Sequence, residues 1–141
     1  MAEAALLCIG LIVATGIIHY RVLTATHRCL IRSGHPIQRR LLIVLVVIMV
    51  THILEVLLYA VGYGIGQALN VGGFSPGPRL SAMEVVYFSL VTYTSLGLGD
   101  IFPQGHLRLM AGAEALNGFL LISCSASLLF ILMNHEKEKL R

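Results

Sequence analysis

The stretch TSLGLGD, from Thr94 to Asp100, has the composition of a backbone segment that binds a cation. Glycines at positions 97 and 99 adopt positive φ values without steric cost, so they let successive carbonyl groups turn to the same side of the chain. A row of carbonyl oxygens on one side replaces the water around a cation. The stretch therefore predicts a site for a dehydrated cation.

Ionisable side chains inside apolar segments form a second candidate set: His19, His52, Glu55 and Glu114. His52 and Glu55 are three residues apart, so we expect a hydrogen-bonded pair on one helix face. We expect Glu55 and Glu114 at similar depths, where two carboxyls cannot both ionise cheaply. A structural network, a proton-sensitive gate and a metal site that needs a further ligand all stay open. We interpret His19 as a satisfied buried histidine.

The composition indicates which kind of molecule positions these groups. The chain has 141 residues, of which 57% are hydrophobic and 12% charged, and its mean hydropathy is +0.84. These values lie far outside the range of soluble domains and predict an integral membrane protein. The net charge of +3 is too small, in so apolar a chain, to indicate a nucleic-acid partner. The three cysteines lack the spacing of a zinc site.

Three apolar segments, about residues 4–26, 41–66 and 107–134, are long enough to cross a membrane. Each exceeds the length that a helix needs for a hydrocarbon core about 30 Å thick. The first segment follows no basic residue and precedes no clear cleavage site, so we expect a retained helix rather than a signal peptide.

The basic residues predict the orientation of these segments. They gather between the first and second segments and after the third: Arg28, Arg32, Arg39, Arg40, Lys137, Lys139 and Arg141. Basic residues favour the cytoplasmic side of a membrane, so the N-terminus is expected outside and the C-terminus in the cytoplasm. The loop from Arg28 to Arg40 is also a candidate contact for anionic lipids.

The segment between the second and third apolar segments cannot form a fourth crossing. Residues 67–80 are rich in Gly and Pro and predict an exposed loop. Residues 81–93 predict a helix that reaches only about 20 Å, after which the chain must return outside before residue 107. The expected fold is an all-α membrane protein with three transmembrane helices and a short re-entrant helix. Several copies are expected to assemble, because one chain is too short to enclose a pathway.

The run YFSLVTYTSLGLGDIFP, from Tyr87 to Pro103, resembles the pore region of tetrameric potassium channels. That pattern has an aromatic pair, a serine, a threonine and then T-T-V-G-Y-G-D, with a proline soon after. The order of helix, pore loop and helix matches as well, and the resemblance covers about residues 41–133. It is nearest to small bacterial channels with an additional N-terminal helix, which implies a location in a bacterial inner membrane.

The resemblance implies a homotetramer in which four filters surround K⁺, coordinated by the carbonyls of Ser95, Leu96, Gly97 and Leu98. It implies a set of filter residues, a set of supporting residues and a hinge in the inner helix. These are Thr94, Ser95, Leu96, Gly97, Leu98 and Gly99 for the filter, Tyr87, Phe88, Thr92 and Asp100 for its support, and Gly118 for the hinge; Ser89 matches a polar residue of the pore helix.

Three filter residues depart from the family pattern. Ser95 replaces the usual threonine and keeps a hydroxyl for the innermost site. Leu96 replaces valine, and Leu98 replaces the tyrosine whose phenol commonly bonds behind the filter. We therefore expect potassium conduction with weaker discrimination against sodium.

The expected organisation has four parts: an N-terminal transmembrane helix (1–27), a basic cytoplasmic linker (28–40), a pore domain (41–134) and a short tail (135–141). Within the pore domain we expect an outer helix, an extracellular loop, a pore helix, a filter and an inner helix, at residues 41–66, 67–80, 81–93, 94–100 and 107–134.

Passive conduction of K⁺ is the leading functional interpretation, with no cofactor besides the permeant ion. The alternatives are a non-selective monovalent cation channel, a non-conducting accessory subunit, and a proton or metal carrier that uses His19, His52, Glu55 and Glu114. We do not expect an enzyme, because no catalytic set of Ser, His and Asp or of Cys and His is placed convincingly.

Overall fold

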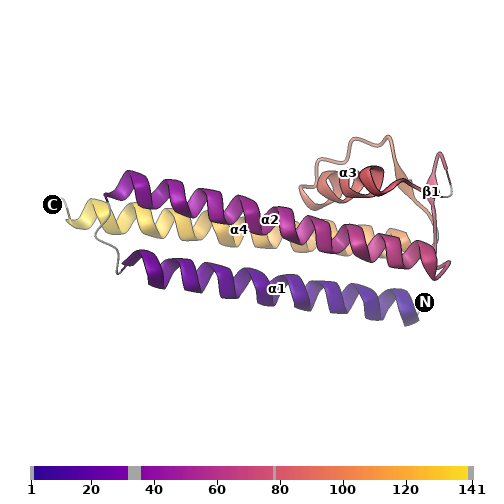
Figure 1. Ribbon diagram of the computed structural model, residues 1–141, viewed down its shortest axis with the longest axis horizontal. Coiled ribbons are helices and arrows are strands. Elements are labelled where there is room, and N and C mark those ends of the chain that lie inside the picture. Colours follow the sequence, from indigo (N-terminus) through magenta and orange to yellow (C-terminus); the bar gives the residue numbers. More distant parts are fainter. Residues whose placement is uncertain (1, 32–35, 78, 140–141) are drawn as a thin grey trace.

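The structure, a computed structural model, describes residues 2–31, 36–77 and 79–139 (Figure 1). Long helices make up most of this part of the chain, and a two-stranded antiparallel sheet lies in the loop region. The elements are α1 (Ala2–Ile31), α2 (Ile37–Ala68), β1 (Phe74–Ser75), α3 (Ala82–Tyr93), β2 (Phe102–Pro103) and α4 (Leu107–Lys139). The expected all-α class is confirmed.

Helices α1, α2 and α4 contain segments long and apolar enough to cross a membrane. These segments are Ala2–Leu30, Ile37–Ala68 and Leu107–Asn134, with mean hydropathies of 2.0, 2.9 and 2.1. Each is longer than the roughly 20 residues that a bilayer core requires. The expectation of three membrane-crossing helices is confirmed at the level of length and composition.

Much of the segment expected to be a linker is helical. Helix α1 continues to Ile31, and α2 begins at Ile37, directly after Pro36 at its N-cap. Proline disfavours helical geometry in the residue before it, so Pro36 sets the start of α2. Arginine is a good helix former, which explains why helical structure includes Arg28, Arg39 and Arg40 although hydrophobicity is lost there.

The arginines of this segment differ in exposure. Arg28 and Arg39 are exposed at the ends of α1 and α2, whereas Arg40 is buried. Arg32 lies outside the described residues. Arg28 and Arg39 therefore remain as candidate contacts for lipid head groups, and Arg40 does not.

Helices α2 and α4 form the layer between the two remaining helices (Figure 1). Helix α1 packs along α2 and α4, and α3 packs on the same two helices from the other side. The N-terminus lies at the end of the bundle that carries β1, and the C-terminus lies at the opposite end. The short helix α3 is therefore held at one end of a long three-helix bundle.

Helix α3 begins at a capping box and packs through aromatic side chains on its buried face. Ser81 and Glu84 form a capping box, in which Glu84 N donates to Ser81 Oγ at 3.3 Å and Ser81 N donates to Glu84 Oε2 at 2.8 Å. On its buried face, Phe88 stacks edge-on against Tyr63 and Phe74, each with ring centroids 5.1 Å away. This aromatic group fixes α3 and β1 against α2.

Candidate functional site

The stretch after α3 leaves helical geometry in a regular way. Residues 94–100 are non-helical and exposed in the single chain. Ser95, Gly97 and Gly99 have positive φ values of 57°, 56° and 76°. Every second residue is thus left-handed, and this alternation turns successive carbonyls toward one side of the chain. The φ values of the described backbone are compatible with a carbonyl-lined cation site.

Ser95 extends the left-handed pattern beyond the two glycines that the sequence indicated. Backbone bonds to the end of α3 hold it: Ser95 N donates to the Thr92 carbonyl at 2.9 Å, and Leu96 N donates to the Val91 carbonyl at 3.0 Å. A non-glycine residue in this region is disfavoured, so these bonds compensate for its strain. In the sequence, the one signal for a left-handed backbone at Ser95 was that this residue lies two positions before Gly97.

The half-buried Tyr87 and the exposed Asp100 fasten the far end of the stretch to α3. Tyr87 donates its hydroxyl proton to Asp100 Oδ2 at 2.7 Å, and Asp100 Oδ1 accepts from Ile101 N at 3.1 Å. The hydrogen bond to this carboxylate raises the pKa of Tyr87 above its ordinary value. Of the expected supporting residues, Tyr87 and Asp100 therefore contact each other. Phe88 instead packs against Tyr63 and Phe74 in the aromatic group, and the Thr92 carbonyl accepts the hydrogen bond from Ser95 N.

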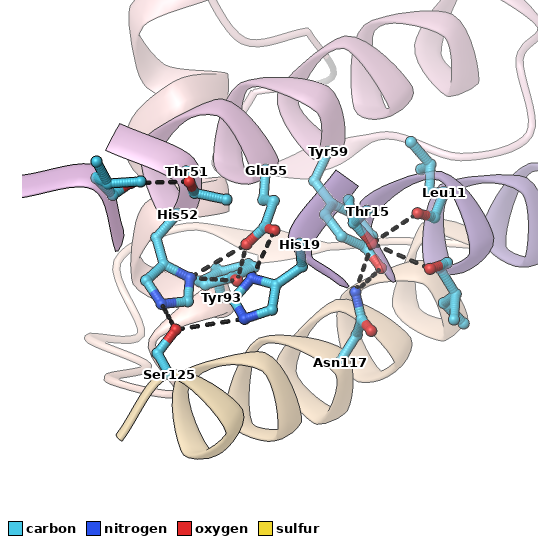
Figure 2. Close-up of polar contacts among 12 residues, drawn as sticks. Leu11, Thr15, His19, Thr51, His52, Glu55, Tyr59, Tyr93, Asn117 and Ser125 are labelled. Atoms are coloured by element: carbon cyan, nitrogen blue, oxygen red, sulfur yellow. Dashed lines mark hydrogen bonds and ion pairs between the residues drawn. The ribbon is translucent and has the colours of Figure 1, made fainter. Parts of the chain in front are cut away.

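A buried polar cluster lies directly behind the end of α3 (Figure 2). Glu55, which is 0% exposed, accepts the hydroxyl proton of Tyr93 at Oε2 over 2.5 Å. His52 Nδ1 lies 3.1 Å from the same oxygen and 2.8 Å from the Tyr93 hydroxyl. His19 Nδ1 lies 2.9 Å from Glu55 Oε1. The expected pair of His52 and Glu55 is present, and His19 and Tyr93 complete it.

Ser125 of α4 closes this cluster from the opposite side. Its Oγ lies 3.1 Å from His52 Nε2 and 3.3 Å from His19 Nε2. All four helices therefore contribute to one group of side chains, which we call the Glu55 cluster: His19, His52, Glu55, Tyr93 and Ser125. Tyr93 immediately precedes Thr94, so the cluster holds the residue from which the non-helical stretch begins.

Glu114 forms a separate polar group on the same helix layer. It is 0% exposed, and Tyr63 donates its hydroxyl proton to Glu114 Oε2 at 2.6 Å. Ser89 Oγ lies 2.5 Å from Glu114 Oε1 and 2.8 Å from the Val56 carbonyl oxygen. The sequence predicted that Glu55 and Glu114 lie at similar depths, where both carboxyls cannot ionise cheaply, and the described bonds give each carboxyl its own partners.

The pore-like segment also matches a known protein family. The model of a family described as "Ion channel" matches residues 41–135, from the first turns of α2 to the last turns of α4. The chain belongs to this ion-channel family. The resemblance to small potassium-channel pore domains is thereby confirmed. No curated protein and no solved structure matches the chain.

Gly118 lies where α4 crosses the C-terminal end of α3. A Cβ atom at this position would overlap the carbonyl oxygen of Tyr93, so only glycine permits the approach of α4 to the end of α3. Helix α4 is continuous through this point. The structure thus gives Gly118 a packing role, and its expected role as a hinge stays a prediction.

The channel carries an additional helix, α1, which lies outside the matched residues and is fastened by polar bonds. Besides His19, Thr15 of α1 accepts a hydrogen bond from Asn117 Nδ2 at 2.8 Å, and Asn117 also donates to the Tyr59 hydroxyl at 3.1 Å (Figure 2). These bonds join α1 to both long helices of the pore domain. Sequence reasoning missed Thr15, Asn117 and Ser125, because polar residues of this kind also occur at sites without partners.

Proposed function

We propose that four copies of the chain assemble around a central axis and conduct K⁺ passively through the carbonyls of Ser95, Leu96, Gly97 and Leu98. The alternating left-handed backbone at positions 95, 97 and 99 is the observation that carries this proposal. The C-terminal end of α3 points its negative dipole toward the same stretch, which favours a cation there. Membership of the ion-channel family supports the same conclusion.

The exposure of the stretch supports assembly around it. Leu96 and Leu98 are 62% and 58% exposed in the single chain, beside backbone that carries no regular structure. Non-helical backbone at membrane depth is tolerated where it is buried in protein or lines a water-filled cavity. Four copies placed symmetrically would cover the leucines and turn four rows of carbonyls toward one axis.

The proposed channel selects K⁺ less strictly than a filter with tyrosine. Leu98 has no hydroxyl group with which to bond behind the filter, so the width of the carbonyl ring is less firmly held. The Ser95 hydroxyl supplies the innermost coordination in place of the usual threonine. A non-selective cation channel is the alternative that the same geometry supports.

Uptake of radioactive rubidium into proteoliposomes tests the proposal. Vesicles that contain the purified protein and a K⁺ gradient should accumulate rubidium, and barium should block the uptake. A sodium gradient should drive much less uptake than a K⁺ gradient. Equal fluxes of the two ions would establish the non-selective alternative, and absence of flux from assembled protein would favour an accessory subunit.

Two alanine substitutions at glycine sharpen that test. Gly97→Ala places a side chain at φ +56°, which costs about 1–2 kcal/mol per chain, so we expect barium-sensitive uptake to fall at least tenfold. Gly64→Ala in α2 is the matched control, because a Cβ there meets nothing within 4 Å. Equal uptake by both variants would contradict a conducting role for residues 95–98.

The proposal includes an orientation with the N-terminus outside and the C-terminus in the cytoplasm of a bacterial inner membrane. Cys29 is exposed near the end of α1 that carries Arg28, the end assigned to the cytoplasm. A membrane-impermeant maleimide should label Cys29 in inverted vesicles and not in intact cells, with Cys29→Ser as the control. The opposite labelling pattern would reverse the orientation and leave the conduction proposal intact.

A further inference from the structure

We propose that His19, His52 and Glu55 bind a divalent transition-metal ion of the zinc class between α1 and the pore domain. One potential ligand atom from each residue lies within 4.8 Å of the other two. Two imidazoles and one carboxylate are a ligand set that zinc prefers, with a fourth position left for water or a further oxygen. The sequence spacing alone indicated two ligands on one helix, His52 and Glu55, and in the structure α1 supplies the third, His19.

The distances are already close to those of a coordinated ion. Tetrahedral zinc sites, with bonds of about 2.0–2.1 Å, hold their ligand atoms about 3.4 Å apart. His19 Nδ1 lies 2.9 Å from Glu55 Oε1, and His52 Nδ1 lies 3.1 Å from Glu55 Oε2. Small outward movements of the side chains would therefore admit the ion between the carboxylate and both rings.

The hydrogen bonds around the cluster fit the metal-bound form of both histidines. When Glu55 is ionised it only accepts, and with Tyr93 donating to it, both Nδ1 atoms must donate as well. Both Nε2 atoms of neutral rings are then acceptors, and both face Ser125 Oγ, which has a single proton to give. One more cation in the cluster, either a proton on one ring or a metal ion, satisfies every partner.

A metal ion bound by the Nδ1 atoms supplies that cation and balances the hydrogen-bond donors and acceptors at Ser125 Oγ. Each ring then carries its proton on Nε2, and the two lone pairs of Ser125 Oγ accept both N–H groups. Such an outer partner fixes the tautomer and the orientation of a metal-binding histidine. The ion also compensates the negative charge of Glu55, which is costly to bury alone among membrane helices.

The cluster is enclosed on one side and reachable from another. His19 and Glu55 are almost fully buried, whereas the His52 side chain is 14% exposed. His52, Tyr93 and Ser125 line a cavity of about 370 Å³ between α2, α3 and α4. The cavity, whose remaining lining is mostly apolar, thus reaches the cluster at three of its five residues.

Metal binding to the purified full-length protein in detergent, with any affinity tag removed, tests the proposal. Equilibrium dialysis against Zn²⁺ should give one saturable ion per chain. Co²⁺ should give the intense visible absorption of a tetrahedral site with nitrogen ligands, and Zn²⁺ should displace it. These measurements require no conduction, so their outcome is independent of the proposed channel function.

Matched histidine variants locate the ion. His19→Gln and His52→Gln should each weaken Zn²⁺ binding at least tenfold, because each removes one of three protein ligands. His106→Gln, on the exposed loop before α4, is the control and should bind Zn²⁺ as the unaltered protein does. Ser125→Ala should weaken binding about 10–100-fold while it leaves all three ligands in place.

Two results would overturn the proposal. The first is an absence of saturable Zn²⁺ binding to the unaltered protein, which is decisive even if a variant fails to fold. The second is unchanged affinity in the folded His19→Gln or His52→Gln protein.

Discussion

Glu55 and Glu114 are both fully buried carboxyls that hold α3, yet their surroundings differ in kind. Glu55 meets two imidazoles and one phenol, whereas Glu114 meets the hydroxyls of Tyr63 and Ser89. Basic partners suit a charged carboxylate, whereas full burial without a basic partner among the described side chains favours a neutral acid. Two chemically distinct carboxyls thus brace one short helix, and we expect Glu55, at its end, to be charged and Glu114, at its middle, to be neutral.

The proton count at Ser89 supports the neutral assignment of Glu114. Ser89 Oγ has one proton and lies within hydrogen-bond distance of both the Val56 carbonyl and Glu114 Oε1. If Ser89 donates to the carbonyl, a protonated Glu114 supplies the proton of the second bond. The amide of glutamine would reproduce this pattern, with its NH₂ group toward Ser89 and its oxygen toward Tyr63.

The largest expected effect follows from replacing each carboxyl by its amide. Glu55→Gln removes a buried charge from two histidines and should lower the free energy of unfolding by about 3–5 kcal/mol. Glu114→Gln keeps the hydrogen bonds of a neutral acid and should cost about 1 kcal/mol or less. Thermal unfolding of the two purified variants in the same detergent measures the difference. Equal losses would show that the two carboxyls share one charge state.

A smaller effect is expected from removing one phenol hydroxyl on each side of the comparison. Tyr93→Phe takes a donor from a charged carboxylate and should cost about 1.5–3 kcal/mol. Tyr63→Phe takes a donor from a neutral acid and should cost about 0.5–1.5 kcal/mol. Both rings are fully buried and keep their packing, so the hydroxyl is the only group that changes. The reverse order of unfolding temperatures would contradict the assignment of charge.

The smallest effect concerns Glu84, an exposed carboxyl at the start of α3 that contrasts with both buried ones. Hydrogen bonds from the Ser81 side chain and backbone lower the pKa of Glu84 below its ordinary value. A lowered folded-state pKa stabilises the protein above the unfolded-state pKa, and this contribution is lost as the pH falls through the folded value. Unfolding temperatures of Glu84→Gln and the unaltered protein should therefore differ slightly at neutral pH and converge in acid. A difference that grows in acid would count against the capping role.

Much of the fold was predictable, because membrane crossing depends on the length and hydrophobicity of single segments. Segments 41–66 and 107–134 correspond closely to α2 and the apolar part of α4, and the re-entrant segment 81–93 corresponds to α3. The helical extensions at residues 28–31 and 37–40 were missed, since hydropathy reports the membrane boundary and not the end of a helix.

The candidate sites were predictable only within single segments. The spacing of His52 and Glu55 revealed one bond, because neighbours on a helix face follow from the sequence. His19 and Ser125 lie 36 and 70 positions from Glu55, and their meeting depends on how the packed helices are rotated and shifted. At Ser95, the left-handed backbone depends on anchoring to α3, which the residue type alone does not indicate.

The link between His19 and Glu55 has a consequence for how the channel enters the membrane. The chain is made from its N-terminus, so α1 is inserted before α2. An acidic residue near the centre of an inserting helix costs roughly 2.5–3.5 kcal/mol on insertion scales. His19 is already present when Glu55 arrives, so the first helix acts as a guide that lowers the cost of inserting the second. Biogenesis of the pore domain, and not only its folded stability, then depends on a helix that lies outside the residues shared with the ion-channel family.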